Sequence, residues 1–347
     1  HETLDADPWL LNCENGTVNL RSGELQSHDC GDLISKTTGV EYPNEPGADA
    51  VLWGEFLQTI FQGDVELIRF VQRLFGSSLV GEVHEHVLPI LWGSGANGKS
   101  VLLETVMAAM GDYAIKAPPN FLMAKRNDSH PTEMADLHGR RLVAITETGD
   151  GQRLDERLTK ELTGGDTIRA RWMRGDFWQF TPSHTAVMAT NHKPVVRGTD
   201  YAIWRRLRLV PFEVTIPEAE QDKQLPQKLR AELPAILCWL VQGCLDWQRE
   251  GLAAPRKVMA ATAGYKTESD TFAEWFDENL VSDPLGEVKA SRAWRSYVSW
   301  CEENCERKMG RTAFGKRMGD RIDGTKKSNG TWYLGIRFQS DDQQQHI

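Results

Sequence analysis

The stretch LPILWGSGANGKS, residues 88–100, decides the fold. An apolar run enters a loop with the pattern Gly93-x-x-x-x-Gly98-Lys99-Ser100, and a segment with helical character, VLLETVMAAM, follows it. This order of strand, glycine loop and helix predicts a phosphate-binding loop, because glycines let backbone N–H groups turn towards phosphates and a helix N-terminus favours negative charge. Lys99 adds a positive charge, and the Ser100 hydroxyl can bind Mg²⁺. We expect the nucleotide to contact Gly93, Ser94, Gly95, Ala96, Asn97, Gly98, Lys99, Ser100 and Val101.

The composition limits what the rest of the chain can be. A length of 347 residues exceeds one ordinary domain. No apolar run approaches the length that spans a membrane, and the start, HETLDADPWL, lacks the features of a signal peptide, so we expect a cytoplasmic protein. Because the sequence does not begin with Met, we expect it to be either part of a longer protein or a processed chain. The six cysteines form no CxxC pair, and only Cys301 and Cys305 share a helical face, which favours buried thiols over zinc or disulfides.

The charge is distributed unevenly along the chain. The formal net charge is −9, yet residues 289–337 hold twelve Lys and Arg against five Asp and Glu, a local charge of +7. A basic terminal module on an acidic body is typical of a protein in which only certain surfaces meet phosphates. A solvated charged face is the alternative.

The hydrophobic pattern predicts an α/β protein with several parts. Residues 1–50 form a strand-rich initial segment, and 51–86 form a helical N-terminal domain. Residues 87–215 alternate apolar strands with helices, which indicates a mainly parallel sheet with ligands at the carboxyl ends of its strands. Residues 216–283 are expected to be a helical connector, 284–338 a winged-helix domain and 339–347 a disordered tail.

The terminal module carries the elements of a winged helix. The segments SRAWRSYVSWCEENCE, RTAFGKRMGDRI and NGTWYLGIRF predict a helix, a second helix and a hairpin closed by Ser328-Asn329-Gly330. The second of these helices would offer three basic side chains to a DNA groove: Arg311, Lys316 and Arg317.

Two strands after the loop end in polar residues suited to phosphoryl transfer. RRLVAITE ends at Glu147, whose carboxylate can bind Mg²⁺ or activate the attacking water. HTAVMATN ends at Asn191, whose amide can orient that water and contact the γ-phosphate. The alternatives are an ordinary surface Glu and a turn-forming Asn.

Between those strands, LTGGDTIRARWMRGDFWQF predicts a β-hairpin with its tip near residues 173–175. Positive charge combined with aromatic surface suits a single strand passing through a channel. The candidate DNA contacts are Arg169, Arg171, Trp172, Met173 and Arg174. A purely structural hairpin with solvated arginines is the alternative.

Arg205 and Arg206 precede the strand LRLVPF and are candidates for an arginine finger. A guanidinium stays charged and donates paired hydrogen bonds, so it could stabilise the transition state at a neighbouring subunit's γ-phosphate. Such a finger would require a closed ring of subunits. Ion pairing with nearby acids is the rival role.

Together GSGANGKS, RRLVAITE, the arginine-rich hairpin, MATNHKPVVRGTDYAIWRRLRLVPF and the basic terminal module resemble the superfamily 3 helicases. The resemblance is to the phage and plasmid primase-helicases related to the poxvirus primase-helicase. It implies an AAA+ type P-loop NTPase core that uses ATP and Mg²⁺. It further implies hexamerisation around DNA, 3′→5′ translocation on single strands at replication forks, and often a primase domain upstream.

Two departures from the family pattern stand out. Several branches end the Walker B strand in two adjacent acids, whereas Thr146 and Thr148 flank a lone Glu147 here, so one carboxylate would serve both metal and water. No polymerase-like acidic motif precedes the initial segment, so priming by this chain is not supported.

Two other functions use the same motifs. A nucleotide-gated DNA-binding initiator or regulator would hydrolyse ATP without unwinding DNA. A small-molecule kinase or GTPase is disfavoured, because TNHKP lacks the spaced Asp of the guanine-selecting NKxD pattern and no Arg- and Gly-rich lid is present.

Overall fold

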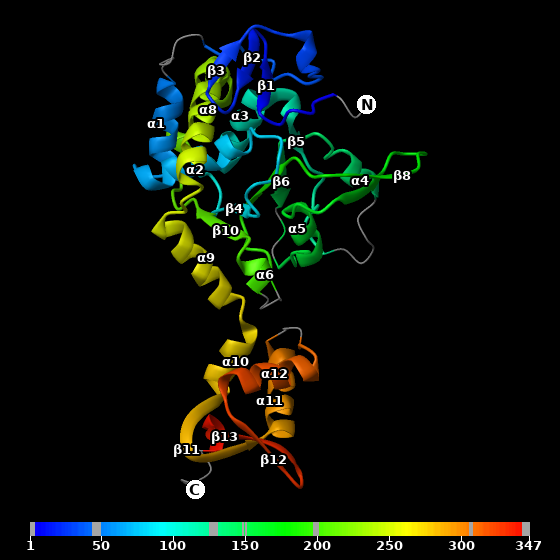
Figure 1. Ribbon diagram of the computed structural model, residues 1–347. Coiled ribbons are helices and arrows are strands. Elements are labelled where there is room, and N and C mark those ends of the chain that lie inside the picture. The colour runs from blue at the N-terminus through cyan, green and yellow to red at the C-terminus, as the bar shows by residue number, and fades with distance from the viewer. Residues whose placement is uncertain are drawn as a thin grey trace. The chain divides into compact units, whose positions relative to one another are not determined.

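The computed structural model describes residues 4–43, 50–124, 131–147, 149, 151–196, 201–304 and 308–341. It divides into two compact units, His1–Tyr265 and Lys266–Ile347 (Figure 1). The division falls within α9 (Arg256–Glu268), earlier than the predicted start of the terminal module at residue 284. Among the described residues, the helices are all too short or too polar to cross a membrane.

The initial segment is a small antiparallel sheet of β1 (Leu10–Cys13), β2 (Gly16–Asn19) and β3 (Glu24–Gln26), followed by the short 3-10 helix η1 (Cys30–Asp32). Leu11 and Val18 pair across β1 and β2 and are fully buried, because alternate side chains of a strand point to the same face.

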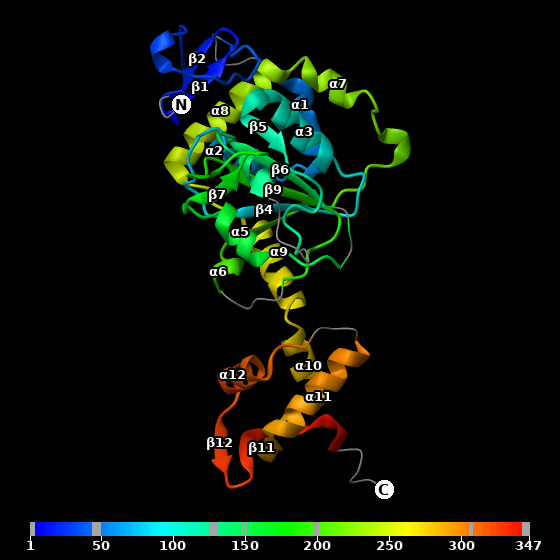
Figure 2. The same cartoon turned by 90° about the vertical axis from the view of Figure 1, so that its right-hand side faces the viewer.

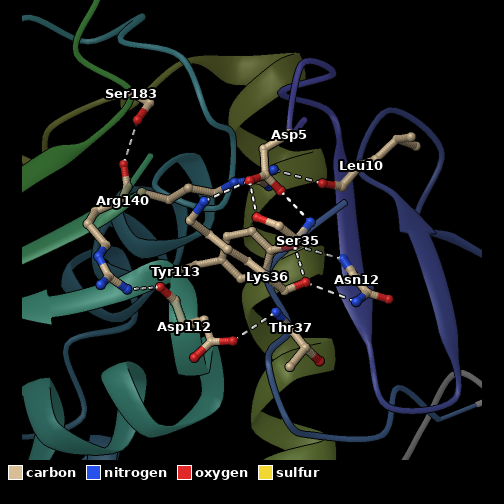
Figure 3. Close-up of polar contacts among 11 residues, drawn as sticks. Asp5, Leu10, Asn12, Ser35, Lys36, Thr37, Asp112, Tyr113, Arg140 and Ser183 are labelled. Atoms are coloured by element: carbon tan, nitrogen blue, oxygen red, sulfur yellow. Dashed lines mark hydrogen bonds and ion pairs between the residues drawn. The ribbon is translucent and has the colours of Figure 1, made fainter. Parts of the chain in front are cut away.

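A polar network joins this segment to the rest of the unit (Figure 3). Lys36 donates to Asp5 at 2.8 Å, and the Asp5 pKa is lowered by its hydrogen bonds from Lys36 and Ser35 in spite of burial, which acts in the opposite direction. The buried guanidinium of Arg141 donates to the Leu10 carbonyl at 2.8 Å and lies 4.4 Å from the centre of the Tyr113 ring. The initial segment is therefore packed onto the α/β core and is not an independent domain.

Helices α1 (Val51–Ile60) and α2 (Val65–Ser77) precede the sheet, and α7 (Leu225–Arg230) and α8 (Leu233–Glu250) return to them. Helix α8 lies against α2 so closely that a Cβ on Gly76 would be 2.2 Å from the Cys244 nitrogen. Ile236 and Leu240 are fully buried in the same core. The prediction of a helical connector at 216–283 is therefore wrong for α7 and α8, because their apolar faces complete the core of the first unit.

The centre of the first unit is a parallel five-stranded sheet in the order β10-β4-β9-β6-β5. Leu88 and Ile90 of β4 enter one core cluster and Leu91 enters the other, so both faces of the sheet are covered (Figure 2). The predicted α/β core with a parallel sheet is confirmed. Its strands are β4 (Leu88–Trp92), β5 (Ala114–Lys116), β6 (Leu142–Glu147), β9 (Thr185–Thr190) and β10 (Leu207–Pro211).

Helices and a hairpin connect these strands. The hairpin consists of β7 (Ile168–Arg171) and β8 (Phe177–Phe180) and projects from the sheet (Figure 1). The helical connections are α3 (Lys99–Met110), η2 (Gly111–Tyr113), α4 (Pro131–Ala135), α5 (Glu156–Leu162), α6 (Tyr201–Trp204) and, after β10, η3 (Glu218–Glu220).

The second unit packs three helices against a three-stranded antiparallel sheet in the order β11-β13-β12. Phe272 and Trp275 of its first helix are fully buried in its aromatic core, which is why the unit begins before residue 284. Its elements are α10 (Thr271–Asn279), β11 (Leu280–Lys289), α11 (Ala290–Glu303), α12 (Arg311–Arg321), β12 (Gly324–Lys327) and β13 (Gly330–Phe338).

The end of the second unit differs from the predicted disordered tail at 339–347. Gln339–Asp341 form the short 3-10 helix η4, and Asp341 pairs with Arg292 at 2.6 Å; the remaining tail residues lie outside the described part of the chain. The prediction of buried thiols is confirmed for Cys13, Cys244 and Cys301 and is wrong for Cys30, which is exposed. Cys238 is half-buried, and Cys305 also lies outside the described residues.

Candidate functional site

The loop between β4 and α3 has the backbone that a phosphate-binding loop requires. Gly95, Ala96 and Gly98 have φ angles of 108°, 48° and 82°, in the left-handed region that favours glycine. A Cβ on Gly98 would also lie 2.5 Å from the Ile60 side chain of α1. The glycine at this position is therefore required both by the turn and by the helix packed against it.

Lys99 lies at the base of this loop. Its side chain is 5% exposed, and its Nζ donates to the Gly93 carbonyl at 2.7 Å and to Asn97 Oδ1 at 2.9 Å. Burial lowers the pKa of Lys99 to about 8. Both acceptors are uncharged, so in the described part of the chain the ammonium has no acidic partner, and a phosphate would be a stronger acceptor than either.

The predicted polar residues meet at one edge of the sheet. Trp92 of β4 pairs with Thr190 of β9, and Thr190 pairs with Glu147 of β6, so the three strands end side by side. The loop, Asn191 and the backbone of Glu147 therefore lie at adjacent carboxyl ends, which is where open parallel sheets bind ligands. Asn191 is exposed, and the side chain of Glu147 lies outside the described residues.

The donors for a metal ion at this edge fit Mg²⁺. The Ser100 hydroxyl is exposed in the first turn of α3, and a carboxylate and a hydroxyl are oxygen ligands of the kind that Mg²⁺ takes together with substrate phosphates. Across the residues that can be described, no three His, Cys, Asp or Glu side chains gather into a metal site.

A pocket of about 570 Å³ adjoins the loop. Its walls come from α1, the loop, α3, the segment before α7 and the start of α7, including Phe56, Gly98, Val101, Ile216 and Leu225. The Ile216 amide donates to the Ala96 carbonyl at 2.7 Å, which fixes this segment beside the loop. Charged side chains also line it: Glu55, Glu220, Asp222 and Lys223. The volume and the mixed apolar and polar lining suit a small ligand such as a nucleoside. The sequence gives no signal for this pocket, because the residues of its walls are distant in the chain and most of them belong to no motif.

The structure separates the two candidate finger arginines. Arg206 is half-buried and donates to the Ala202 carbonyl at 2.7 Å and to Thr163 Oγ1 at 3.2 Å. Arg205 is exposed, and within the described ranges its side chain forms no hydrogen bond or ion pair. Of the two, Arg205 is therefore available to another molecule.

The β7–β8 hairpin has two different faces. Arg169 and Arg171 lie over the Phe177 ring, at 4.3 Å and 5.2 Å from its centre. On the other face Trp172 stacks on Trp178 with centroids 5.5 Å apart and a tilt of 18°. The tip contains Met173, which is 81% exposed, and Arg174, whose φ is 63°. The charged side chains thus lie on the Phe177 face and at the tip, whereas both faces offer aromatic surface, because Trp172 is 50% exposed and Phe177 is 48% exposed.

The basic residues of α12 do not form one uniform surface. Arg317 pairs with Asp270 of the same unit at 2.8 Å and lies 4.9 Å from the Phe272 ring centre, so it holds α12 against α10. Arg311 and Lys316 are exposed, and neither side chain has a partner among the described residues. The side chains of Arg311 and Lys316 are therefore accessible to an external ligand.

Two family models match the chain. One is described as "D5 N terminal like" and matches residues 1–62; the other is a family of unknown function (DUF5906) and matches residues 91–206. The second match covers the phosphate loop, the hairpin and both candidate arginines.

Curated relatives come from large DNA viruses. The chain is 28% identical over 299 residues to "Putative helicase L207/L206" of Acanthamoeba polyphaga mimivirus, covering 80% of this chain and 31% of that protein. It is 27% identical over 259 residues to "Putative helicase 022R" of Frog virus 3, covering 68% of this chain and 26% of that protein. It is 25% identical over 330 residues to "Putative primase C962R" of African swine fever virus, covering 87% of this chain and 34% of that protein. The chain thus spans about a third of the length of these relatives.

Solved structures resemble the fold. An apo structure of the NrS-1 C terminal region matches with a TM-score of 0.54 at 12% identity, covering 94% of this chain and 82% of that one. A second apo structure of that region gives a TM-score of 0.52 at 11% identity, covering 96% of this chain and 83% of that one. The relatives confirm the predicted resemblance: this chain is similar to the helicases and primases of the primase-helicase group.

Proposed function

We propose that this chain is the ATP-driven motor of a replicative DNA helicase. The observation that carries the proposal is the phosphate loop next to the carboxyl ends of β6 and β9. Lys99 lies buried at the base of this loop, and both of its hydrogen-bond acceptors are uncharged. The names of the viral relatives support a role in DNA replication.

Each residue at the sheet edge has a role in this proposal. Lys99 contacts the β- and γ-phosphates, and the pocket beside α1 takes the nucleoside. Ser100 and Glu147 would hold Mg²⁺, which would neutralise the negative charge that develops on the phosphates. Glu147 also activates the attacking water, and Asn191 orients it.

ATP hydrolysis in this proposal takes place between subunits of a homo-hexameric ring. Arg205 is the arginine finger, because its exposed side chain is available to a neighbour's γ-phosphate while Arg206 is engaged within its own unit. Hexamerisation and the 3′→5′ direction rest on the resemblance to superfamily 3 helicases alone, as do the AAA+ class and a primase domain elsewhere in a longer protein.

DNA is contacted by both units. In the hairpin, Arg169, Arg171 and Arg174 meet phosphates while Phe177 and the tip offer a surface to bases. The second unit acts as a winged helix, with Arg311 and Lys316 of α12 at the DNA. We further propose that the protein acts in the cytoplasm of a bacterial or phage-infected cell.

ATP turnover measured with and without single-stranded DNA tests this assignment. Lys99→Ala should abolish hydrolysis, whereas Arg174→Ala should keep basal hydrolysis and lose its stimulation by DNA. Lys316→Ala provides a comparison, because it lies in the other unit and should weaken DNA binding without changing basal turnover. Full turnover by the Lys99→Ala variant would place the active site elsewhere.

A further inference from the structure

A second charged pocket lies in the first unit, away from the phosphate loop. It has a volume of about 540 Å³ and lies between α2 and the turn that leads from α8 into α9. No residue of the phosphate loop lines it. Its lining consists of Glu66, Arg69 and Arg73 from α2 together with Ala253, Ala254, Pro255 and Arg256.

Arg73 forms the fixed part of this pocket. It is 7% exposed, and its Nε and Nη2 donate to the carbonyls of Leu252 and Ala253 at 3.1 Å and 3.3 Å. Its Nη1 pairs with Glu250 at 3.4 Å. Arg73 therefore holds the turn in place against α2, and its own charge is largely offset by a carboxylate.

Arg69 and Arg256 are different, because their side chains are exposed at the rim. Within the described part of the chain, neither forms an ion pair or a side-chain hydrogen bond. Arg256 is moreover the first residue of the 13-residue helix α9, where the helix dipole disfavours a cation. An anion in the pocket would bind both guanidinium groups and relieve the unfavourable position of Arg256.

The charge of the pocket indicates which anion fits. Guanidinium groups bind phosphate oxygens through paired hydrogen bonds, so a phosphate group suits two arginines that line one pocket. Glu66 adds a negative charge to the same lining and disfavours a phosphate that carries two or more charges. A singly charged phosphodiester therefore fits better than a free phosphate, and the exposed rim lets a chain continue on both sides of it.

We propose that the pocket between α2 and α9 binds a backbone phosphate of a polynucleotide through Arg69 and Arg256. The inference rests on the proposed DNA-binding function and adds to it a contact separate from the hairpin. Figure 1 shows α2 and the start of α9 on one side of the first unit and the tip of the β7–β8 hairpin on the opposite side. DNA is thus contacted on two sides of the same unit.

The test is the salt dependence of DNA binding by the whole chain. Affinity for a labelled single-stranded oligonucleotide is measured at several salt concentrations for the wild type and for the double variant Arg69→Gln/Arg256→Gln. Each phosphate contact contributes about 0.7 to the slope of log affinity against log salt on single strands, so the slope should fall by at least about 0.7. The matched control is Arg230→Gln, an exposed arginine of α7 outside the pocket, which should keep the wild-type slope.

The other outcomes are distinguishable. Calorimetric titration with inorganic phosphate should give the same weak binding for the wild type and the double variant. A tight phosphate site that the double variant loses would identify a free phosphate as the ligand and overturn the proposal. An unchanged slope would also overturn it, and a change in oligomeric mass with that unchanged slope would make the pocket a protein interface. If the wild type binds no DNA at low salt, the proposed function fails as well.

Discussion

Raising the pH should weaken nucleotide binding through Lys99. Burial lowers the pKa of this lysine to about 8, and the phosphates of a nucleotide would raise it again by favouring the charged form. If only the ammonium form binds, the dissociation constant should rise about 25-fold between about pH 7.5 and pH 9.5, a loss of about 2 kcal/mol.

The assay is equilibrium binding of a non-hydrolysable ATP analogue across that pH range. Lys99→Arg is the matched control, because a guanidinium keeps its charge throughout and should give a flat profile at whatever affinity remains. A wild-type profile that stays flat, or an equal loss of affinity in the Lys99→Arg variant, would refute the assignment of the pH dependence to this ammonium group.

Three further predictions concern stability and the division of roles. Burial lowers the pKa of His184 from 6.5 to about 4. Because the unfolded state takes up this proton more readily than the folded state, the free energy of unfolding should fall by about 2 kcal/mol between neutral pH and about pH 5. Denaturant unfolding should show this loss in the wild type and a smaller one in His184→Gln. Gly98→Ala should cost about 1–3 kcal/mol of unfolding free energy and weaken nucleotide binding, because its φ of 82° is strained for alanine and its Cβ would meet α1. Arg317→Ala should lower the melting temperature, because it breaks the ion pair with Asp270 within the second unit. Arg311→Ala should leave the melting temperature unchanged and weaken DNA binding. If the two variants changed the melting temperature and the DNA affinity equally, the separate structural and DNA-binding roles of these arginines would be contradicted.

Local patterns predict the part of the fold that depends on neighbours in sequence. The phosphate loop from Gly93 to Ser100 combines a buried strand, glycines with unusual φ angles and a helix start, so its structure is encoded within thirteen residues. The hairpin with its tip at Arg174 is similarly local. Strands β6 and β9 could be identified from their apolar runs, which placed Glu147 and Asn191 at strand ends.

Tertiary packing decides what the sequence could not predict. Helix α8 resembles a connector by pattern, yet its contact with α2 through Gly76 makes it part of the core. Arg317 and Arg311 look equivalent in the sequence of α12. Arg317 forms a structural ion pair only because Asp270, the N-cap residue of α10, lies beside it, whereas Arg311 remains an exposed cation. The pocket that contains Arg69 and Arg256 is lined by residues far apart in the chain. The local feature that points to it in the sequence is Arg256, a basic residue at the start of a helix.

Strand displacement tests the central claim most directly. The chain is incubated with a forked duplex that carries single-stranded arms, together with ATP and Mg²⁺, and release of the labelled strand is followed. We expect displacement with ATP, none with a non-hydrolysable analogue and none with the Lys99→Ala variant. Binding of DNA and turnover of ATP with the duplex left intact would contradict the motor assignment and support a nucleotide-gated DNA-binding initiator.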